Sequence, residues 1–114
     1  MSESIYPQAS KELAHKRRQL APNIQAAWET FSKTVFADGA LPAKTKQLIA
    51  VAVAHVTQCP YCIQGHTKNA LRHGATQLEI MEAIWVAAEM RAGGAYAHSL
   101  ISISAMSEEH AQSS

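Results

Sequence analysis

The stretch Leu48–Val56 reads LIAVAVAHV and is the longest apolar run in the 114-residue chain. Short valine-rich runs occur in buried strands as well as in buried helices. We favour a helix because alanines interleave the valines and no other segment shows the alternating pattern of a partner strand. Since the run is apolar on nearly every face, we expect this helix at the buried centre of a bundle.

The segments before this run also carry helical signals. A first helix is expected from Ser10 to Leu20, because Pro22 pushes the residue before it out of the α region. A second helix should follow, with apolar side chains at intervals of four, three and four residues. These are Ile24, Trp28, Phe31 and Val35.

The segments after the run predict three more helices. One begins at Cys59-Pro60 and ends before Gly74, a natural left-handed cap. Thr76-x-x-Glu79 is typical of a capping box that opens the next helix. We expect Gly93–Gly94 to interrupt or end that helix, a last one to run from Ala95 to about Met106, and the tail 107–114 to fray. The prediction is an all-α bundle of about six helices in a single domain, residues 1–114.

Composition and charge exclude several classes of protein. Apolar residues make up 47% of the chain and charged ones 17%, which is typical of a globular domain. The net charge is +1 and no basic run exceeds Lys16-Arg17-Arg18, so we expect no nucleic-acid partner. The first ten residues lack the pattern of a secretory signal, and nine apolar residues are too few for a membrane span. We therefore expect a cytoplasmic protein without a membrane partner.

The short chain is thin for a monomer with so many apolar side chains. The last two predicted helices are short and rich in apolar residues, and they flank small residues. We expect them to leave surface for self-association, so that the protein is a homo-oligomer.

The only two cysteines stand three residues apart in Cys59-Pro60-Tyr61-Cys62, and His66 follows four residues after the second. At about 3.6 residues per turn, Cys59, Cys62 and His66 share one face of a helix. In a reducing compartment a lone pair at this spacing is more often catalytic or metal-binding than a structural staple.

This arrangement predicts activated thiols. If Pro60 is the first helical residue, Cys59 is the N-cap and Cys62 lies in the first turn, where unpaired N–H groups and the helix dipole favour a thiolate. His66 can take the proton of Cys62. A thiolate can then attack a peroxide, become a sulfenic acid and condense with its neighbour to a disulfide. We assign Cys62 as the attacking thiol and Cys59 as the resolving one, although in thioredoxin-type motifs the first cysteine is the stronger nucleophile.

The pattern Cys59-x-x-Cys62-x-x-x-His66 resembles the core of the alkylhydroperoxidase AhpD-like proteins of the carboxymuconolactone decarboxylase family. The similarity continues through Ala70, His73-Gly74-Ala75-Thr76 and Glu79-Ile80-Met81-Glu82-Ala83, extends upstream through Leu41-Pro42 and Lys46 to Val53, and covers about residues 40–105. It implies an all-α fold assembled as trimers or hexamers. It also implies peroxidase or disulfide-exchange activity on a hydroperoxide, with a dithiol or thioredoxin-like reductant. We expect no cofactor and no metal.

One position departs from this family. Its peroxidases are associated with a glutamate twelve residues before the first cysteine, where this chain has Gln47. An amide orients a ring by hydrogen bonding but does not accept a proton at neutral pH. His55, one helical turn before Cys59, is our first substitute for the missing carboxylate, and Glu82 and Glu89 are the others.

Four alternatives stay open at this stage. The first is a disulfide reductase or redox sensor with weak peroxidase activity. The second is a zinc site with the ligands His55, Cys59, Cys62 and His66. Four ligands within twelve residues of helix are, however, crowded for tetrahedral closure. Lactone decarboxylation is disfavoured because the decarboxylating members do not depend on a cysteine pair. A helical assembly module with incidental cysteines is the last alternative.

Overall fold

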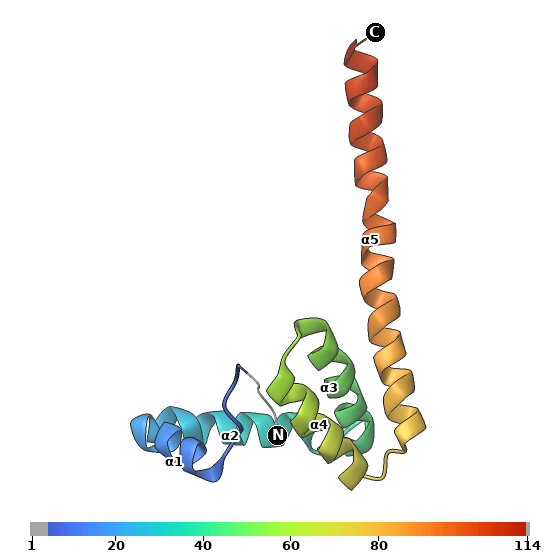
Figure 1. Cartoon of the computed structure of the whole chain (residues 1–114). Coiled ribbons are helices and arrows are strands. Elements are labelled where there is room, and N and C mark those ends of the chain that lie inside the picture. The colour runs from blue at the N-terminus through green and yellow to red at the C-terminus, as the bar shows by residue number, and fades with distance from the viewer. Residues whose placement is uncertain (1–4, 114) are drawn as a thin grey trace. The chain divides into compact units, whose positions relative to one another are not determined.

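The structure, a computed structural model, describes residues 5–113. All regular structure in this range is helical, which confirms the predicted all-α class (Figure 1). The helices are α1 (Lys11–Leu20), α2 (Pro22–Phe36), α3 (Ala43–Thr57), α4 (Pro60–Arg72) and α5 (Gln77–Ser113). The described residues divide into two compact units, 5–43 and 44–113. The expectation of a single domain stays a prediction.

The first unit pairs α1 with α2. Ser10 caps α1 by accepting a hydrogen bond from the Leu13 amide at 3.1 Å, and Pro22 is the first residue of α2, as its fixed φ favours. An exposed ion pair, Arg18 to Glu29 at 2.9 Å, joins the two helices. This exposed pair contributes little to stability, and neither α1 nor α2 holds a buried residue.

The second unit is built around Val51 of α3, whose side chain is fully buried. Ala70 of α4, Ala75 and Ile80 are buried against it, and Leu48 and Ile84 pack on the cluster. The apolar run is helical, as predicted, but only one of its faces is buried within this unit. Ile49, Val53 and Val56 remain 41–52% exposed.

The connection from α4 to α5 follows the sequence signals closely. Gly74 has φ +91°, a conformation that side chains with a Cβ rarely adopt, and it reverses the chain after α4. Thr76 and Glu79 form the predicted capping box. The Glu79 amide donates to the Thr76 hydroxyl at 3.0 Å, and the Thr76 amide donates to the Glu79 carboxylate at 2.8 Å.

The expected break at Gly93–Gly94 is absent, and this is a correction to the sequence prediction. A single helix, α5, continues through both glycines, so the described residues hold five helices and not six. Glycine costs about 0.5–1 kcal/mol relative to alanine within a helix but does not forbid helical dihedral angles. Good helix formers flank the pair, and neither a proline nor a cap is present to stop the helix.

The tail was expected to fray, yet α5 continues to Ser113, while Ser114 lies outside the described residues. At 1.5 Å per residue, α5 is about 55 Å long. Its first half packs beside α3 and α4, and its second half extends away from them (Figure 1).

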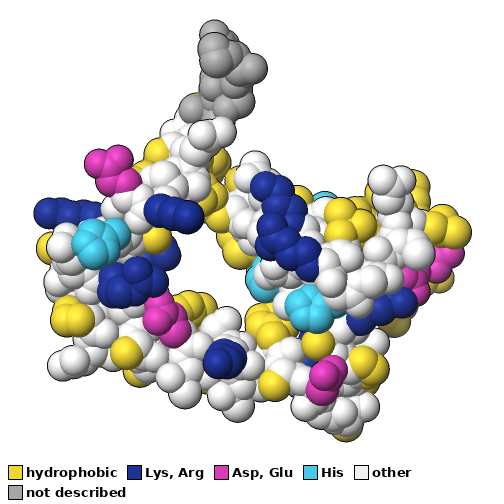
Figure 2. Space-filling model, turned by 90° about the horizontal axis from the view of Figure 1, so that it is seen from below, with side chains coloured by type: hydrophobic (Ala, Val, Ile, Leu, Met, Phe, Trp, Pro, Cys, Tyr) yellow, Lys and Arg dark blue, Asp and Glu magenta, His cyan; other side chains and the backbone are white. Residues whose placement is uncertain are grey.

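No helix within residues 5–113 combines the length and the hydropathy that a bilayer crossing requires. On the face seen in Figure 2, Lys and Arg side chains are dispersed among apolar, acidic and histidine side chains.

Candidate functional site

The two cysteines form a disulfide at the start of α4. Their Cα atoms lie 5.2 Å apart. Cys59 is the N-cap with an extended backbone, Pro60 is the first helical residue, and the Cys59 sulfur accepts a hydrogen bond from the Cys62 amide at 3.2 Å. The N-terminal N–H groups of α4 and the positive end of its dipole therefore lie at the sulfur atoms, where they favour a thiolate once the bond is reduced.

The turn between α3 and α4 fixes the direction of the Cys59 side chain. Gln58 has φ +58°, in the left-handed region, and ends α3. The Cys59 amide then donates back to the Ala54 carbonyl at 3.1 Å. This bond uses a carbonyl that the helix leaves without a partner at its C-terminal end.

Arg91 of α5 closes the same turn, and sequence reasoning missed it. Its guanidinium donates to the Val56 carbonyl at 2.6 Å. The two residues are 35 positions apart, so no local pattern indicates the contact. Arg91 thereby ties α5 to the last turn of α3, three residues before the first cysteine.

His66 and Gln47 meet across α4 and α3. The His66 Nδ1 atom and the Gln47 Oε1 atom are 2.8 Å apart, and Gln47 is only 4% exposed. An amide oxygen only accepts hydrogen bonds, so Nδ1 carries the proton in this contact. In the neutral ring Nε2 is then the basic nitrogen. Gln47 thus orients the ring and selects its tautomer.

Burial lowers the pKa of His66 below its usual value of 6.5. The ring is therefore neutral at pH 7 and has the protonation state of a general base. His66 lies one helical turn after Cys62 on the same face of α4.

The other predicted candidates lie elsewhere in the second unit. His55 is half-buried in α3, with its Nδ1 atom 2.8 Å from the Val51 carbonyl of the same helix, so Nδ1 donates there. Glu82 is exposed on α5. Glu89 is also exposed on α5, with its carboxylate beside Gly93.

The described residues hold no preformed zinc site. Both sulfur atoms are joined to one another, and within residues 5–113 no three His, Cys, Asp or Glu side chains gather as metal ligands.

The model of the carboxymuconolactone decarboxylase family matches residues 22–103. The chain belongs to this family. A family member of known structure from Legionella pneumophila, crystallised in its apo form, superposes with a TM-score of 0.67 and is 34% identical, over 69% of this chain and 70% of that one. A Methanobacterium thermoautotrophicum protein gives a TM-score of 0.68 at 32% identity, over 73% and 93%.

Two further proteins are similar to this family member in sequence. A Paracoccus denitrificans protein named "Uncharacterized protein 4 in cox locus" is 58% identical over 108 residues, which are 95% of this chain and 96% of the relative. A Mycobacterium tuberculosis protein named alkyl hydroperoxide reductase is 31% identical over 78 residues, which are 63% of this chain but 22% of that protein.

Proposed function

We propose that the protein is a cysteine-based oxidoreductase that reduces hydroperoxides through the Cys59–Cys62 pair. The observation that carries this proposal is a disulfide at the N-terminus of α4 with a neutral, oriented histidine one turn away. The similarity to a protein named alkyl hydroperoxide reductase supports the choice of substrate class.

The cycle begins with the reduced pair. His66 takes the Cys62 proton, and the thiolate attacks the terminal peroxide oxygen, so that the O–O bond breaks and an alcohol leaves with one proton. Cys62 is now a sulfenic acid. The Cys59 thiol displaces its hydroxyl group as water and forms the disulfide. A dithiol or thioredoxin-like reductant then reduces the disulfide and is itself oxidised.

Gln47 tunes this cycle toward slower proton transfer. A carboxylate at that position would stabilise the imidazolium that forms when His66 takes a proton, whereas a neutral amide supplies only a hydrogen bond. This gives weight to a second candidate function, a disulfide reductase or redox sensor with weak peroxidase activity. Either function consumes a reductant in each catalytic cycle, so we place the protein in a reducing compartment, the cytoplasm.

Peroxide consumption coupled to a dithiol tests the proposal and assigns the two thiols. Cys62→Ser is expected to abolish consumption. Cys59→Ser, the matched variant, should still form a sulfenic acid that a dimedone-type reagent traps. Full residual activity of Cys62→Ser would contradict the assignment, and trapping in Cys62→Ser instead of Cys59→Ser would reverse the two roles.

A further inference from the structure

Arg91 occupies a position on the apolar stripe with which α5 packs on its own unit. Ile80 and Ala87 are buried and Ile84 packs on the core cluster, at intervals of four and three residues. The next position of this spacing is Arg91. The stripe therefore brings a positive charge to the turn between α3 and α4, where the guanidinium donates to the Val56 carbonyl at 2.6 Å.

No carboxylate neutralises this charge within the described residues. Glu82 and Glu89 are the nearest acidic residues along α5, and at about 100° per residue both lie on the side of the helix opposite to Arg91. The Glu89 carboxylate lies beside Gly93, further along the helix. The His55 ring of α3 donates back to its own helix. The guanidinium thus keeps its full positive charge beside the turn.

The two helix ends at this turn have opposite effects on Cys59. The last carbonyls of α3 carry the negative end of its dipole, whereas the first N–H groups of α4 carry a positive end. The Ala54 carbonyl accepts from the Cys59 amide, and the Val56 carbonyl accepts from Arg91. The His66 ring is neutral at pH 7 and adds no charge. Arg91 therefore offsets the end of α3 that would disfavour a thiolate at Cys59.

The guanidinium lies within electrostatic range of the Cys59 sulfur. Three residues span at most about 11 Å even when extended, and the left-handed Gln58 folds the segment from Val56 to Cys59 back on itself. Exposed charges interact over about 8–10 Å at physiological salt before screening removes the effect. A charge at the Val56 carbonyl is therefore near enough to stabilise a thiolate at Cys59.

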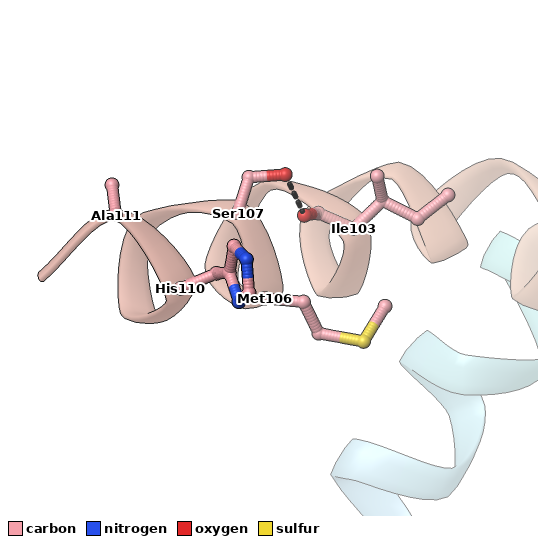
Figure 3. A pocket seen from close by; sticks show the side chains of 5 residues that line it. All are labelled: Ile103, Met106, Ser107, His110 and Ala111. Atoms are coloured by element: carbon pink, nitrogen blue, oxygen red, sulfur yellow. Dashed lines mark hydrogen bonds between the residues drawn. The ribbon is translucent and has the colours of Figure 1, made fainter. Parts of the chain in front are cut away.

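The far end of α5 is outside this range. Its last turns form a shallow pocket that begins twelve residues after Arg91, about 18 Å further along the helix. The pocket contains one titratable side chain, His110, which is too remote to affect the cysteine pair. Figure 3 shows the side chains that line it: Ile103, Met106, Ser107, His110 and Ala111.

We propose that Arg91 is a positioning residue that holds Cys59 as a thiolate in the reduced protein and thereby eases reduction of the Cys59–Cys62 disulfide. It acts through the Val56 carbonyl and through its own charge, without touching the substrate. This inference rests on the proposed function, because it concerns the step that resets the pair.

In that step a thiolate of the dithiol reductant attacks the Cys62 sulfur, the disulfide bond breaks, and Cys59 leaves as a thiolate. The second thiol of the reductant then displaces Cys62, so that two electrons pass to the pair and the reductant becomes a disulfide. One proton of the reductant goes to Cys62 and the other to solvent. A leaving thiol of lower pKa leaves faster, so Arg91 accelerates this step.

Alkylation of Cys59 by iodoacetamide tests the role of the charge. In the Cys62→Ser variant Cys59 is the only thiol of the chain, so the pH dependence of alkylation reports its pKa. In that background Arg91→Gln keeps a donor for the Val56 carbonyl but removes the charge. It should raise the pKa of the Cys59 thiol and slow alkylation at neutral pH about threefold. Arg91→Lys keeps the charge and should keep the rate.

A control and a salt series separate charge from structure. Arg72→Gln removes a charge at the far end of α4 and should leave the alkylation rate unchanged. At about 1 M salt the difference between Arg91→Gln and its parent should shrink, because the screening length falls to about 3 Å. Equal rates with Arg91 and with Arg91→Gln would overturn the proposal. Slow alkylation in both Arg91→Gln and Arg91→Lys at every salt concentration would indicate a purely structural role and would also overturn it.

The wild-type pair gives two further tests. Alkylation with Arg91 in place should slow as salt rises, and a rate independent of salt would contradict the proposal without any substitution at this position. In a glutathione buffer, Arg91→Gln should shift the equilibrium of the intact pair about threefold toward the disulfide. No shift would overturn the proposal and leave the peroxide cycle intact. A shift in a protein whose thiols do not react with peroxide would support the role of Arg91 and refute the proposed peroxidase function alone.

Discussion

The start of α4 and the second half of α5 are both helical, yet different forces specify them. At the start of α4, a proline, an N-cap, a left-handed residue and an arginine from α5 converge within a few residues. The second half of α5 is held by its own backbone bonds, and its apolar side chains are exposed. The first region is fixed by contacts within the chain and is suited to positioning a reactive pair. The second is suited to a contact that the chain does not supply for itself.

The largest expected effect comes from the core that supports α4. Val51→Ala removes two methyl groups from a fully buried position and should lower the free energy of unfolding by about 2 kcal/mol. Val53→Ala on the exposed side of the same helix should change it by no more than about 0.5 kcal/mol. Urea unfolding followed by circular dichroism measures both. Equal losses of stability in the two variants would mean that α3 is buried on both faces. The contrast between a helix packed within the chain and the exposed second half of α5 would then weaken.

The next prediction concerns the proton acceptor beside the pair. Gln47→Glu should raise the pKa of His66, because a carboxylate stabilises the imidazolium. It should also raise the rate of peroxide consumption near neutral pH. NMR titration of the ring and a pH–rate profile measure the two effects. A raised pKa without a faster rate would mean that another base already serves.

The burial of His66 makes the stability of the folded protein depend on pH. Because burial lowers the folded-state pKa of His66 below its usual 6.5, the unfolded chain binds the proton more readily. The contribution of His66 to stability is therefore present above pH 6.5 and is lost as pH falls through the folded-state pKa. His66→Asn should remove this part of the pH dependence, and an unchanged profile would exclude His66 as its source.

A smaller effect is expected at the junction between the two regions. Arg91→Met removes the hydrogen bond to the Val56 carbonyl and should cost about 1 kcal/mol while loosening the turn before Cys59. Faster hydrogen exchange of the Cys59 amide would report that loosening. Arg72→Met, which removes only a surface bond to Asn69, is the control and should leave that amide unchanged. Identical exchange in both variants would exclude Arg91 as a positioning residue.

The smallest expected effect on stability comes from replacing a glycine in the middle of α5. Gly94→Ala should stabilise the protein by about 0.5–1 kcal/mol, because the position is helical and has open space for a methyl group. Gly65→Ala in α4 meets the same open space and should act alike. The midpoint temperatures of thermal unfolding measure the stability of both variants. Destabilisation by Gly94→Ala alone would show that a neighbour approaches that side of α5.

Features encoded by neighbouring residues were predictable from the sequence. The cap at Cys59, the left-handed Gly74 and the Thr76–Glu79 box each depend on groups within a few positions. The contact between Gln47 and His66 spans 19 residues, and the sequence suggested a role for Gln47 only through resemblance. Arg91 had no signal because its partner is a backbone carbonyl on another helix.

The predicted helix break at Gly93–Gly94 was wrong because it rested on the two glycines alone. Glycine marks a break only when the surrounding residues also disfavour a helix, and here they favour one. The partial exposure of Leu48–Val56 likewise depends on what packs against it, which composition alone does not reveal.

A count of free thiols tests the central claim most directly. The chain has two cysteines, so the reduced protein should show two reactive thiols and, after one equivalent of hydroperoxide, none. A mass shift of minus two hydrogens should accompany the loss, and a dithiol should restore both thiols. Two thiols that persist in the presence of peroxide would contradict a redox-active Cys59–Cys62 pair.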